Sequence, residues 1–278
     1  MTTATITQLF VYPVKSTRAL AAPRVRLTAT GLEWDRQWML IDANGTFLSQ
    51  RTHPQLACLV PTIGSDALQL EAPGRRPLRV PFGTGGERRT VRVHADACVG
   101  VDQGAEAAQW ASEVLGQTVR LVRVPRDPAR RANPRYAGAT AAPMGFADGF
   151  PLLVCNAASL ADLNRRMPAP VPMERFRPNL VLEGLPAWAE DHIATLTVGP
   201  VTLRLVKPCT RCTIPSVDQR SGERSTDPGP VLRQFRFDAT LPGIMFGENA
   251  VIAAGVGAEL GCGMNCRVAF APDVAGVS

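Results

Sequence analysis

Two cysteines, Cys209 and Cys212, lie two residues apart in the segment Lys207-Pro208-Cys209-Thr210-Arg211-Cys212. A pair with this spacing can be half of a zinc site, a redox dithiol, or two ordinary buried thiols. It can also supply one thiolate to a larger metal-containing cofactor, because thiolates are good ligands for soft metal ions. The spacing by itself leaves all four interpretations open.

The rest of the sequence weighs against two of these interpretations, the zinc site and the redox dithiol, and against an iron–sulfur cluster. A zinc site needs two more ligands, and the other close pair, Cys262 and Cys266, follows after 49 residues with an irregular C-x3-C spacing. A thioredoxin-like dithiol opens a helix, whereas Thr213-Ile214-Pro215 is a poor helix start. An iron–sulfur cluster needs four thiolates in a recognisable run. His53, His94 and His192 lack metal-ligand spacing and are expected to be surface or satisfied polar residues.

The elements that must position these thiols are mostly strands. Short β-branched or alternating runs end in Gly, Pro, Asn or Asp, which is typical of strands. The predicted strands include Thr5–Val11, Gln37–Asp42, Arg120–Val124, Pro178–Leu182, Ile193–Val198, Val201–Val206 and Arg267–Phe270. The fold class is therefore predicted to be mainly β (α+β).

Two segments have helical spacing instead, Ala105–Leu115 and Ala158–Met167, and Asn156 or Ser159 could cap the second. Leu160, Leu163 and Met167 recur at one helical face and are expected to be packed. Between residues 125 and 145 the chain is rich in Pro, Arg and Ala without apolar periodicity. This stretch is predicted to be a linker or excursion between two β units.

Composition narrows the class of protein. Seven scattered cysteines in 278 residues indicate reduced thiols and a cytoplasmic protein. No export signal or membrane-spanning run is visible, so no membrane association is expected. The formal charge of +6 is spread along the chain without basic blocks, and nucleic-acid binding is not expected. Only two of the 30 basic residues are lysines, Lys15 and Lys207, which hints that an ammonium group is needed at both places.

Motifs in both halves of the chain resemble those of MOSC proteins that carry an N-terminal MOSC β-barrel domain. The resemblance runs from about Thr5 to Phe270, is greatest to the amidoxime-reducing components and their bacterial relatives, and follows the family's order. It rests on the segments Val11-Tyr12-Pro13-Val14-Lys15-Ser16, Gly31-Leu32-Glu33-Trp34-Asp35-Arg36-Gln37-Trp38, Arg51 with Pro54, Ser159 to Asn164, Arg175-Phe176-Arg177-Pro178-Asn179, the cysteine pair, Val217-Asp218 and Phe246-Gly247.

The resemblance implies two β-barrel-like domains with a few helices. The N-terminal β-barrel domain is expected at residues 1–124, the linker or excursion at 125–145, and the MOSC domain at 146–278. Together they are expected to hold a molybdenum cofactor, in which a pterin dithiolene and one protein thiolate bind molybdenum.

Carried over residue by residue, the resemblance makes Cys212 the metal ligand and Cys209 a second family cysteine that does not bind the metal. Arg211 is expected to orient substrate beside Cys212. Lys15, Ser16 and Arg36 match positions that hold the phosphate and pterin, Arg177 and Asn179 match the other wall of the groove, and Asp148 and Gly149 match a loop that faces it. The chain departs from many relatives at Pro215, where they have threonine, and this proline is expected to stiffen the loop and reshape the substrate mouth.

The implied activity is an oxidoreductase that reduces N-hydroxylated compounds, namely amidoximes, hydroxylamines and N-hydroxylated bases. Electrons are expected to come from a separate flavin, haem or Fe–S protein, and the chain is expected to be a monomer. The rival interpretation is a protein that binds molybdenum cofactor or carries sulfur to it without reductase turnover.

Overall fold

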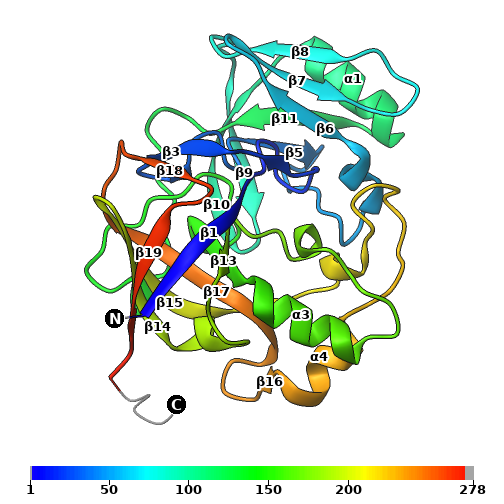
Figure 1. Ribbon diagram of the computed structural model, residues 1–278. Helices are drawn as coiled ribbons and strands as arrows, with labels where there is room; N and C mark the ends of the chain where they lie inside the picture. The colour runs from blue at the N-terminus through cyan, green and yellow to red at the C-terminus, as the bar shows by residue number, and fades with distance from the viewer. Residues whose placement is uncertain (1, 273–278) are drawn as a thin grey trace.

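The computed structural model describes residues 2–272 and confirms the mainly β fold (Figure 1). The last six residues of the predicted MOSC domain, 273–278, lie outside the described residues. The strands are β1 (Thr2–Val11), β2 (Leu20–Ala21), β3 (Arg24–Thr28), β4 (Gly31–Leu32), β5 (Trp38–Asp42), β6 (Val60–Ile63), β7 (Ala67–Glu71), β8 (Leu78–Pro81), β9 (Arg88–Val93), β10 (Asp96–Asp102), β11 (Val119–Arg123), β12 (Leu152–Asn156), β13 (Leu180–Glu183), β14 (Ile193–Val198), β15 (Val201–Arg211), β16 (Phe237–Asp238), β17 (Gly243–Ala254), β18 (Glu259–Gly261) and β19 (Asn265–Phe270).

Seven strands close into a barrel in the order β12-β13-β1-β19-β14-β15-β17, because β17 also pairs with β12. Every neighbouring pair is antiparallel except β12 and β13. Side chains that alternate along these strands form the largest apolar cluster, which includes Ile6, Val154, Leu196, Leu203 and Val268. Each fully buried aliphatic side chain of this kind contributes about 1.5–3 kcal/mol to folding.

Smaller sheets, drawn mostly in blue, cyan and green, lie in the upper half of Figure 1, and β18 joins one of them from the C-terminal end of the chain. Their strand orders are β5-β11-β10-β9, β6-β7-β8 and β18-β3-β4. Helix α1 (Ala105–Leu115), whose bounds match the predicted helix, buries Ala107, Ala111 and Leu115 in the apolar cluster of this part. It ends at Gly116, whose left-handed backbone is a common helix stop.

Helix α3 (Ala157–Arg166) confirms the second predicted helix. Of the two proposed caps, Asn156 takes that role, because its side chain accepts a hydrogen bond from the backbone N–H of Ala158. Leu163 and Met167 are buried and Leu160 is half-buried in one apolar cluster, as the helical spacing predicted. The short helices α2 (Pro134–Ala137) and α4 (Gly229–Phe235) complete the α-helices of residues 2–272.

The division into domains at residues 125–145 stays a prediction. Strand β1 lies before this division in the sequence but belongs to the barrel, whose other strands follow it. β1 precedes all the other N-terminal strands and yet pairs with β13 and β19 of the barrel, as the adjacent blue and red arrows of Figure 1 show. The segment 125–145 is itself packed, since Ala132, Ala137, Ala142 and Met144 form an apolar cluster with Val251. Within residues 2–272 no helix is long and apolar enough to cross a membrane.

Candidate functional site

A cleft of about 480 Å³ lies where the N-terminal sheets meet the barrel. It is called the cleft below. Its lining comes from both halves of the chain: Lys15, Ser16, Arg36, Arg51, His94, Ala147, Asp148, Gly149, Phe150, Leu152, Leu153, Phe176, Arg177, Asn179, Lys207, Cys209, Thr210, Arg211, Cys212, Ile214, Pro242, Gly243 and Asn249. All nine residues that the sequence proposed for the site are among them.

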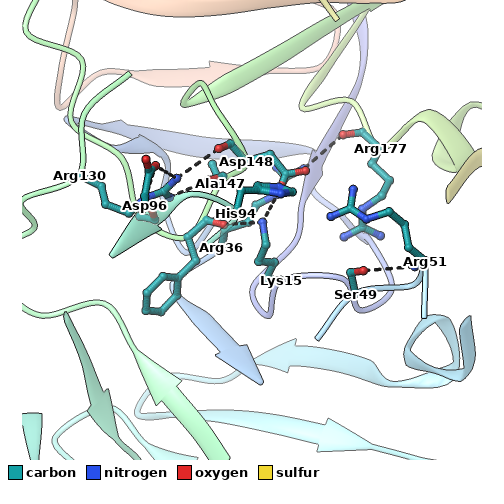
Figure 2. Close-up of polar contacts among 12 residues, drawn as sticks. Lys15, Arg36, Ser49, Arg51, His94, Asp96, Arg130, Ala147, Asp148 and Arg177 are labelled. Atoms are coloured by element: carbon teal, nitrogen blue, oxygen red, sulfur yellow. Dashed lines mark hydrogen bonds and ion pairs between the residues drawn. The ribbon is translucent and has the colours of Figure 1, made fainter. Parts of the chain in front are cut away.

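Lys15 is held where β1 has ended and the chain turns beside β5. Its backbone N–H donates to the carbonyl of Trp38 at 2.8 Å, and its Nζ donates to the carbonyl of Phe146 at 2.8 Å. Its ammonium also forms an ion pair with Asp148 (Figure 2). Burial lowers the pKa of Lys15, and the Asp148 carboxylate opposes this effect. The ion pair therefore keeps a positive charge on a side chain that is 6% exposed.

Asp148 lies in a loop that Arg130 holds in place. The guanidinium of Arg130 donates to the carbonyls of Gly145, Ala147 and Asp148 at 2.8, 2.7 and 3.2 Å and pairs with Asp96 at 2.8 Å. Figure 2 shows the contacts of Arg130 with Asp96, Ala147 and Asp148. Because Arg130 is buried, removing it would leave three carbonyl groups short of a donor. Sequence reasoning missed Arg130, which lies in a segment without periodicity.

His94 was expected to be an ordinary polar residue, but it lines the cleft beside Asp148. Its Nε2 lies 3.1 Å from Oδ1 of Asp148, and its ring packs edge-on against Phe47. Partial desolvation in the cleft raises the pKa of Asp148, but the Lys15 charge and the hydrogen bond with His94 outweigh this effect and hold the pKa well below its usual range. Asp148 thus stays ionised between two basic groups. No spacing signal in the sequence pointed to His94.

Two guanidinium groups lie against the ring of Tyr12, which is fully buried. The central carbons of Arg36 and Arg177 are each 4.2 Å from the ring centroid, at a distance typical of cation–π contacts. Arg36 pairs with Asp35 at 2.6 Å, and Arg177 donates to the carbonyl of Thr17 at 2.7 Å. Burial lowers the pKa of Arg177 to about 10 and raises that of the Tyr12 hydroxyl. Arg177 therefore stays charged near neutral pH, and the contacts with Tyr12 hold both guanidinium groups at the wall of the cleft.

Asn179 holds Arg36 in place through buried hydrogen bonds. Its Oδ1 accepts hydrogen bonds from Arg36 at 3.2 Å and from the backbone N–H of Leu153 at 3.1 Å. Its Nδ2 donates to the carbonyl of Phe10 at 3.2 Å. With 1% of its surface exposed, Asn179 fixes Arg36 and joins β1 to β12. The predicted direct contact of Asn179 with a cofactor stays a prediction.

Backbone strain gathers at the cleft. Six residues other than glycine have positive φ within residues 2–272, and four of them line the cleft: Ser16, Arg36, His94 and Arg177, with φ of 69°, 47°, 54° and 58°. Such conformations cost about 1–3 kcal/mol each and persist where the surroundings impose them, which is common at functional sites. Four such residues in one cleft support a binding role.

Strand β15 places the cysteine pair at the cleft. It continues to Arg211, beyond the predicted end at Val206, so Cys209 and Arg211 are strand residues and Cys212 follows directly. The Cys212 side chain is exposed in the cleft. Arg211 Nη1 lies 2.9 Å from Sγ of Cys209, and its Nη2 donates to the carbonyl of Phe176 at 2.7 Å. The Nε of Arg211 is buried and has no hydrogen-bond partner.

The remaining cysteines lie elsewhere and are free thiols. Burial raises the pKa of Cys58, Cys98, Cys155 and Cys266, and these thiols stay protonated near neutral pH. Within residues 2–272 no three Cys, His, Asp or Glu side chains gather in a way that could hold a metal ion. The geometry therefore gives no support to a zinc site shared with Cys262 and Cys266.

Pro215 was expected to reshape the mouth of the site. It is instead buried in a short 3-10 helix, Ile214–Ser216, and its carbonyl accepts a hydrogen bond from Arg175 at 3.3 Å. Its neighbour Ile214 lines the cleft and Pro215 does not. The proline thus contributes to the packing of the loop beside the cleft, and its effect on the mouth stays a prediction.

The cleft carries a large excess of positive charge. Six cationic side chains line it, Lys15, Arg36, Arg51, Arg177, Lys207 and Arg211, against one carboxylate, Asp148. In the described part of the chain, four of the six make no ion pair with a carboxylate: Arg51, Arg177, Lys207 and Arg211. Such a cleft attracts an anionic ligand. Of these four, the sequence had proposed Arg177 and Arg211 for the site, and had used Arg51 and Lys207 only as motif residues.

Two family models match this chain. Residues 3–118 match the family model of the MOSC N-terminal beta barrel domain, and residues 141–263 match that of the MOSC domain. The chain is 34% identical over 248 residues to human (Homo sapiens) mitochondrial amidoxime-reducing component 1, covering 84% of this chain and 72% of that protein. The mouse (Mus musculus) protein of that name is 33% identical over 242 residues, covering 84% and 71%. A bovine (Bos taurus) molybdenum cofactor sulfurase is 28% identical over 243 residues, but these are 80% of this chain and 28% of that protein.

Proposed function

This chain belongs to the MOSC protein family, and on that premise we propose that it is a molybdenum-cofactor-dependent oxidoreductase that reduces N-hydroxylated compounds. The proposed substrates are amidoximes, hydroxylamines and N-hydroxylated bases, and the proposed electron source is a separate flavin, haem or Fe–S protein. The amidoxime-reducing relatives support this activity, since each is matched over more than two thirds of its length.

One observation carries the proposal: a thiol exposed in a cationic cleft. Cys212 is exposed there, and six cations surround a volume of about 480 Å³. A phosphorylated pterin is anionic and planar and needs guanidinium forks and N–H donors, each charge-assisted hydrogen bond contributing about 1.5–3 kcal/mol. The unpartnered Nε of Arg211 and the four strained residues of the cleft fit such a ligand. The donor set therefore suits the molybdenum cofactor.

In this proposal Cys212 supplies the metal's protein thiolate, and Lys15, Ser16, Arg36 and Arg177 hold the anionic tail and the pterin. Bound there, the cofactor supplies two-electron redox chemistry for removing the N-hydroxyl oxygen.

The chain's own part is to orient and to exclude water. Asp148 keeps the Lys15 ammonium charged and in place, and Tyr12 fixes Arg36 and Arg177. Arg211, held by the Phe176 carbonyl and next to Cys212 in the cleft lining, orients substrate. Positions fixed in this way need no rearrangement during the reaction, which is the main protein contribution to such catalysis.

A second candidate is a protein that binds or carries molybdenum cofactor without reductase turnover. The molybdenum cofactor sulfurases among the relatives favour it. Both candidates use the same cleft, so binding alone does not separate them.

The separating experiment combines elemental analysis with a substrate panel. Purified protein is assayed for molybdenum and zinc, and benzamidoxime and a hydroxylamine are offered with a chemical reductant. One molybdenum per chain together with reduction supports the oxidoreductase, and molybdenum without reduction supports the carrier. One zinc per chain and no molybdenum would overturn both.

A further inference from the structure

Lys207, like Arg51, is a cation of the cleft that the proposed cofactor site leaves unexplained. It lies in β15, five residues before Cys212, and its side chain is half-buried. Lys15 and Arg36 are neutralised by Asp148 and Asp35, and Arg177 is buried against Tyr12. Lys207, in contrast, has no carboxylate within ion-pair distance among residues 2–272 and lines the cleft directly.

An aromatic side chain positions the Lys207 ammonium. Its Nζ lies 4.7 Å from the ring centroid of Tyr136, which is a cation–π distance. The Tyr136 ring in turn packs edge-on against Phe150, another residue of the cleft lining, with centroids 6.2 Å apart. The cation–π contact holds the ammonium in place and leaves its charge available. A carboxylate would also hold it in place but would neutralise its charge.

Tyr136 itself is fixed by the barrel. It lies in α2, and Arg204 of β15 donates to the carbonyl of Ala137 at 3.2 Å and to the Thr140 hydroxyl at 2.8 Å. The same strand therefore carries Lys207 and anchors the helix that supports it. Residues 119–140, which include Tyr136, lie between the stretches that match the two family models. The support of Lys207 thus comes from a part of the chain outside both models.

We propose that Lys207, positioned by Tyr136, selects N-hydroxylated substrates that carry an anionic group such as a carboxylate or a phosphate. This inference rests on the proposed function and names its substrate class. Five residues of extended chain span at most about 17 Å. Lys207, Cys212 and Phe150 all line the cleft, so one small molecule bound there can contact both the ammonium and the sulfur.

The test uses three probes that differ only in charge: benzamidoxime, 4-carboxybenzamidoxime and 4-(aminomethyl)benzamidoxime. Their dissociation constants are measured on the molybdenum-loaded protein without an electron donor, so that no turnover is needed. We expect the carboxylated probe to bind about tenfold more tightly than the neutral one, as one charge-assisted hydrogen bond provides. The preference should shrink as salt is raised, because the ammonium is half-exposed.

Variants test whether Lys207 causes the preference for the carboxylated probe. In Lys207→Met, the dissociation constants of the neutral and carboxylated probes should lie within about twofold of each other. Lys207→Glu should reverse the preference, so that the aminomethyl probe binds most tightly. Tyr136→Leu should weaken the preference, and Tyr136→Phe, which keeps the ring, should retain it. Arg75→Met removes an exposed positive charge outside the cleft lining and should leave the preference unchanged.

Equal binding of the neutral and carboxylated probes by the unmodified protein would overturn the inference. So would a preference that survives in Lys207→Met, or loss of bound molybdenum from Lys207→Met, which would make Lys207 part of the cofactor site. Failure of the proposed function is seen separately. In that case the protein binds the probes with the charge preference and reduces none of them when a reductant is added.

Discussion

The guanidinium of Arg211 lies 2.9 Å from the sulfur of Cys209, although Cys212 is its neighbour in sequence. Strand geometry explains this contact, because residues two apart on a strand point to the same face. The contact anchors Cys209 in the wall and leaves the sulfur of Cys212 exposed in the cleft. The two cysteines therefore have different surroundings, and the different roles that the family resemblance implied for them stay a prediction.

We expect Cys209→Ala to keep bound molybdenum and most turnover and to lose about 1 kcal/mol of folding free energy. The loss arises because the Arg211 N–H would no longer have its acceptor. Urea unfolding and elemental analysis on the same preparation measure both quantities. Loss of molybdenum from a folded Cys209→Ala protein would contradict the prediction that Cys209 does not bind the metal.

The ion pair between Lys15 and Asp148 joins two segments that lie 133 residues apart. We expect Lys15→Met and Asp148→Asn each to lower the content of molybdenum. A double-mutant cycle on unfolding free energy should give a coupling of about 1 kcal/mol, since Asp148 is 60% exposed and solvent weakens the pair. Additive effects would show that the two side chains act independently.

Two buried glutamates near the barrel should make stability depend on pH. Burial raises the pKa of Glu190 to about 7 and that of Glu248 to about 10, and one oxygen of each has no hydrogen-bond partner. Above its ordinary pKa each carboxyl binds more protons in the folded than in the unfolded chain. The free energy of unfolding must therefore fall as pH rises, between about 4.5 and 7 for Glu190 and up to about 10 for Glu248.

Denaturant unfolding across pH 4.5 to 10 measures this dependence. Glu190→Gln should flatten the lower part of the profile and Glu248→Gln the upper part, while the exposed Glu71→Gln leaves the profile as it is. For Glu190 the effect amounts to about 3 kcal/mol across its window. A profile that rises with pH over this range, or one that neither variant alters, would be incompatible with buried neutral carboxyls.

Gly247 belongs to a motif of the family resemblance, and the structure gives the physical reason for a glycine there. Its φ is +76°, and a Cβ at this position would lie 2.6 Å from Sγ of Cys155 and 2.9 Å from the carbonyl oxygen of Val154. We expect Gly247→Ala to cost about 2–4 kcal/mol through backbone strain and overlap. Gly257→Ala, also at positive φ but with no atom within 4 Å of the added Cβ, is the matched control and should cost less.

Local patterns predicted the fold class and several elements well. The bounds of α1 and β14 were given by periodicity, because each has a clear apolar face and a Gly or turn at its end. Strand β9, Arg88–Val93, was harder to see, because Arg and Thr occupy its exposed positions. The pairing of β1 with β13 and β19 could not be predicted, since contacts between residues more than 170 apart leave no periodic signal.

The site was predicted where side chains belong to short motifs and missed where tertiary structure assembles it. Lys15, Arg36, Arg177 and Cys212 lie in motifs, and the structure brings them to one cleft. His94 contacts the Asp148 carboxylate, and Arg130 donates to the Asp148 carbonyl. Both contacts exist only after the loop of residues 145–149 has folded against β9 and β10. The cation–π support of Lys207 by Tyr136 is likewise tertiary.

The central claim is that the sulfur of Cys212 binds molybdenum in this cleft. X-ray absorption at the molybdenum K-edge counts sulfur ligands directly and can be compared between the unmodified protein and Cys212→Ser, with circular dichroism to show that the fold is kept. We predict that the variant has one sulfur ligand fewer and that its benzamidoxime reduction is at least about a thousandfold lower, as for loss of an essential group. An unchanged sulfur count with normal turnover in a folded Cys212→Ser protein would contradict the account.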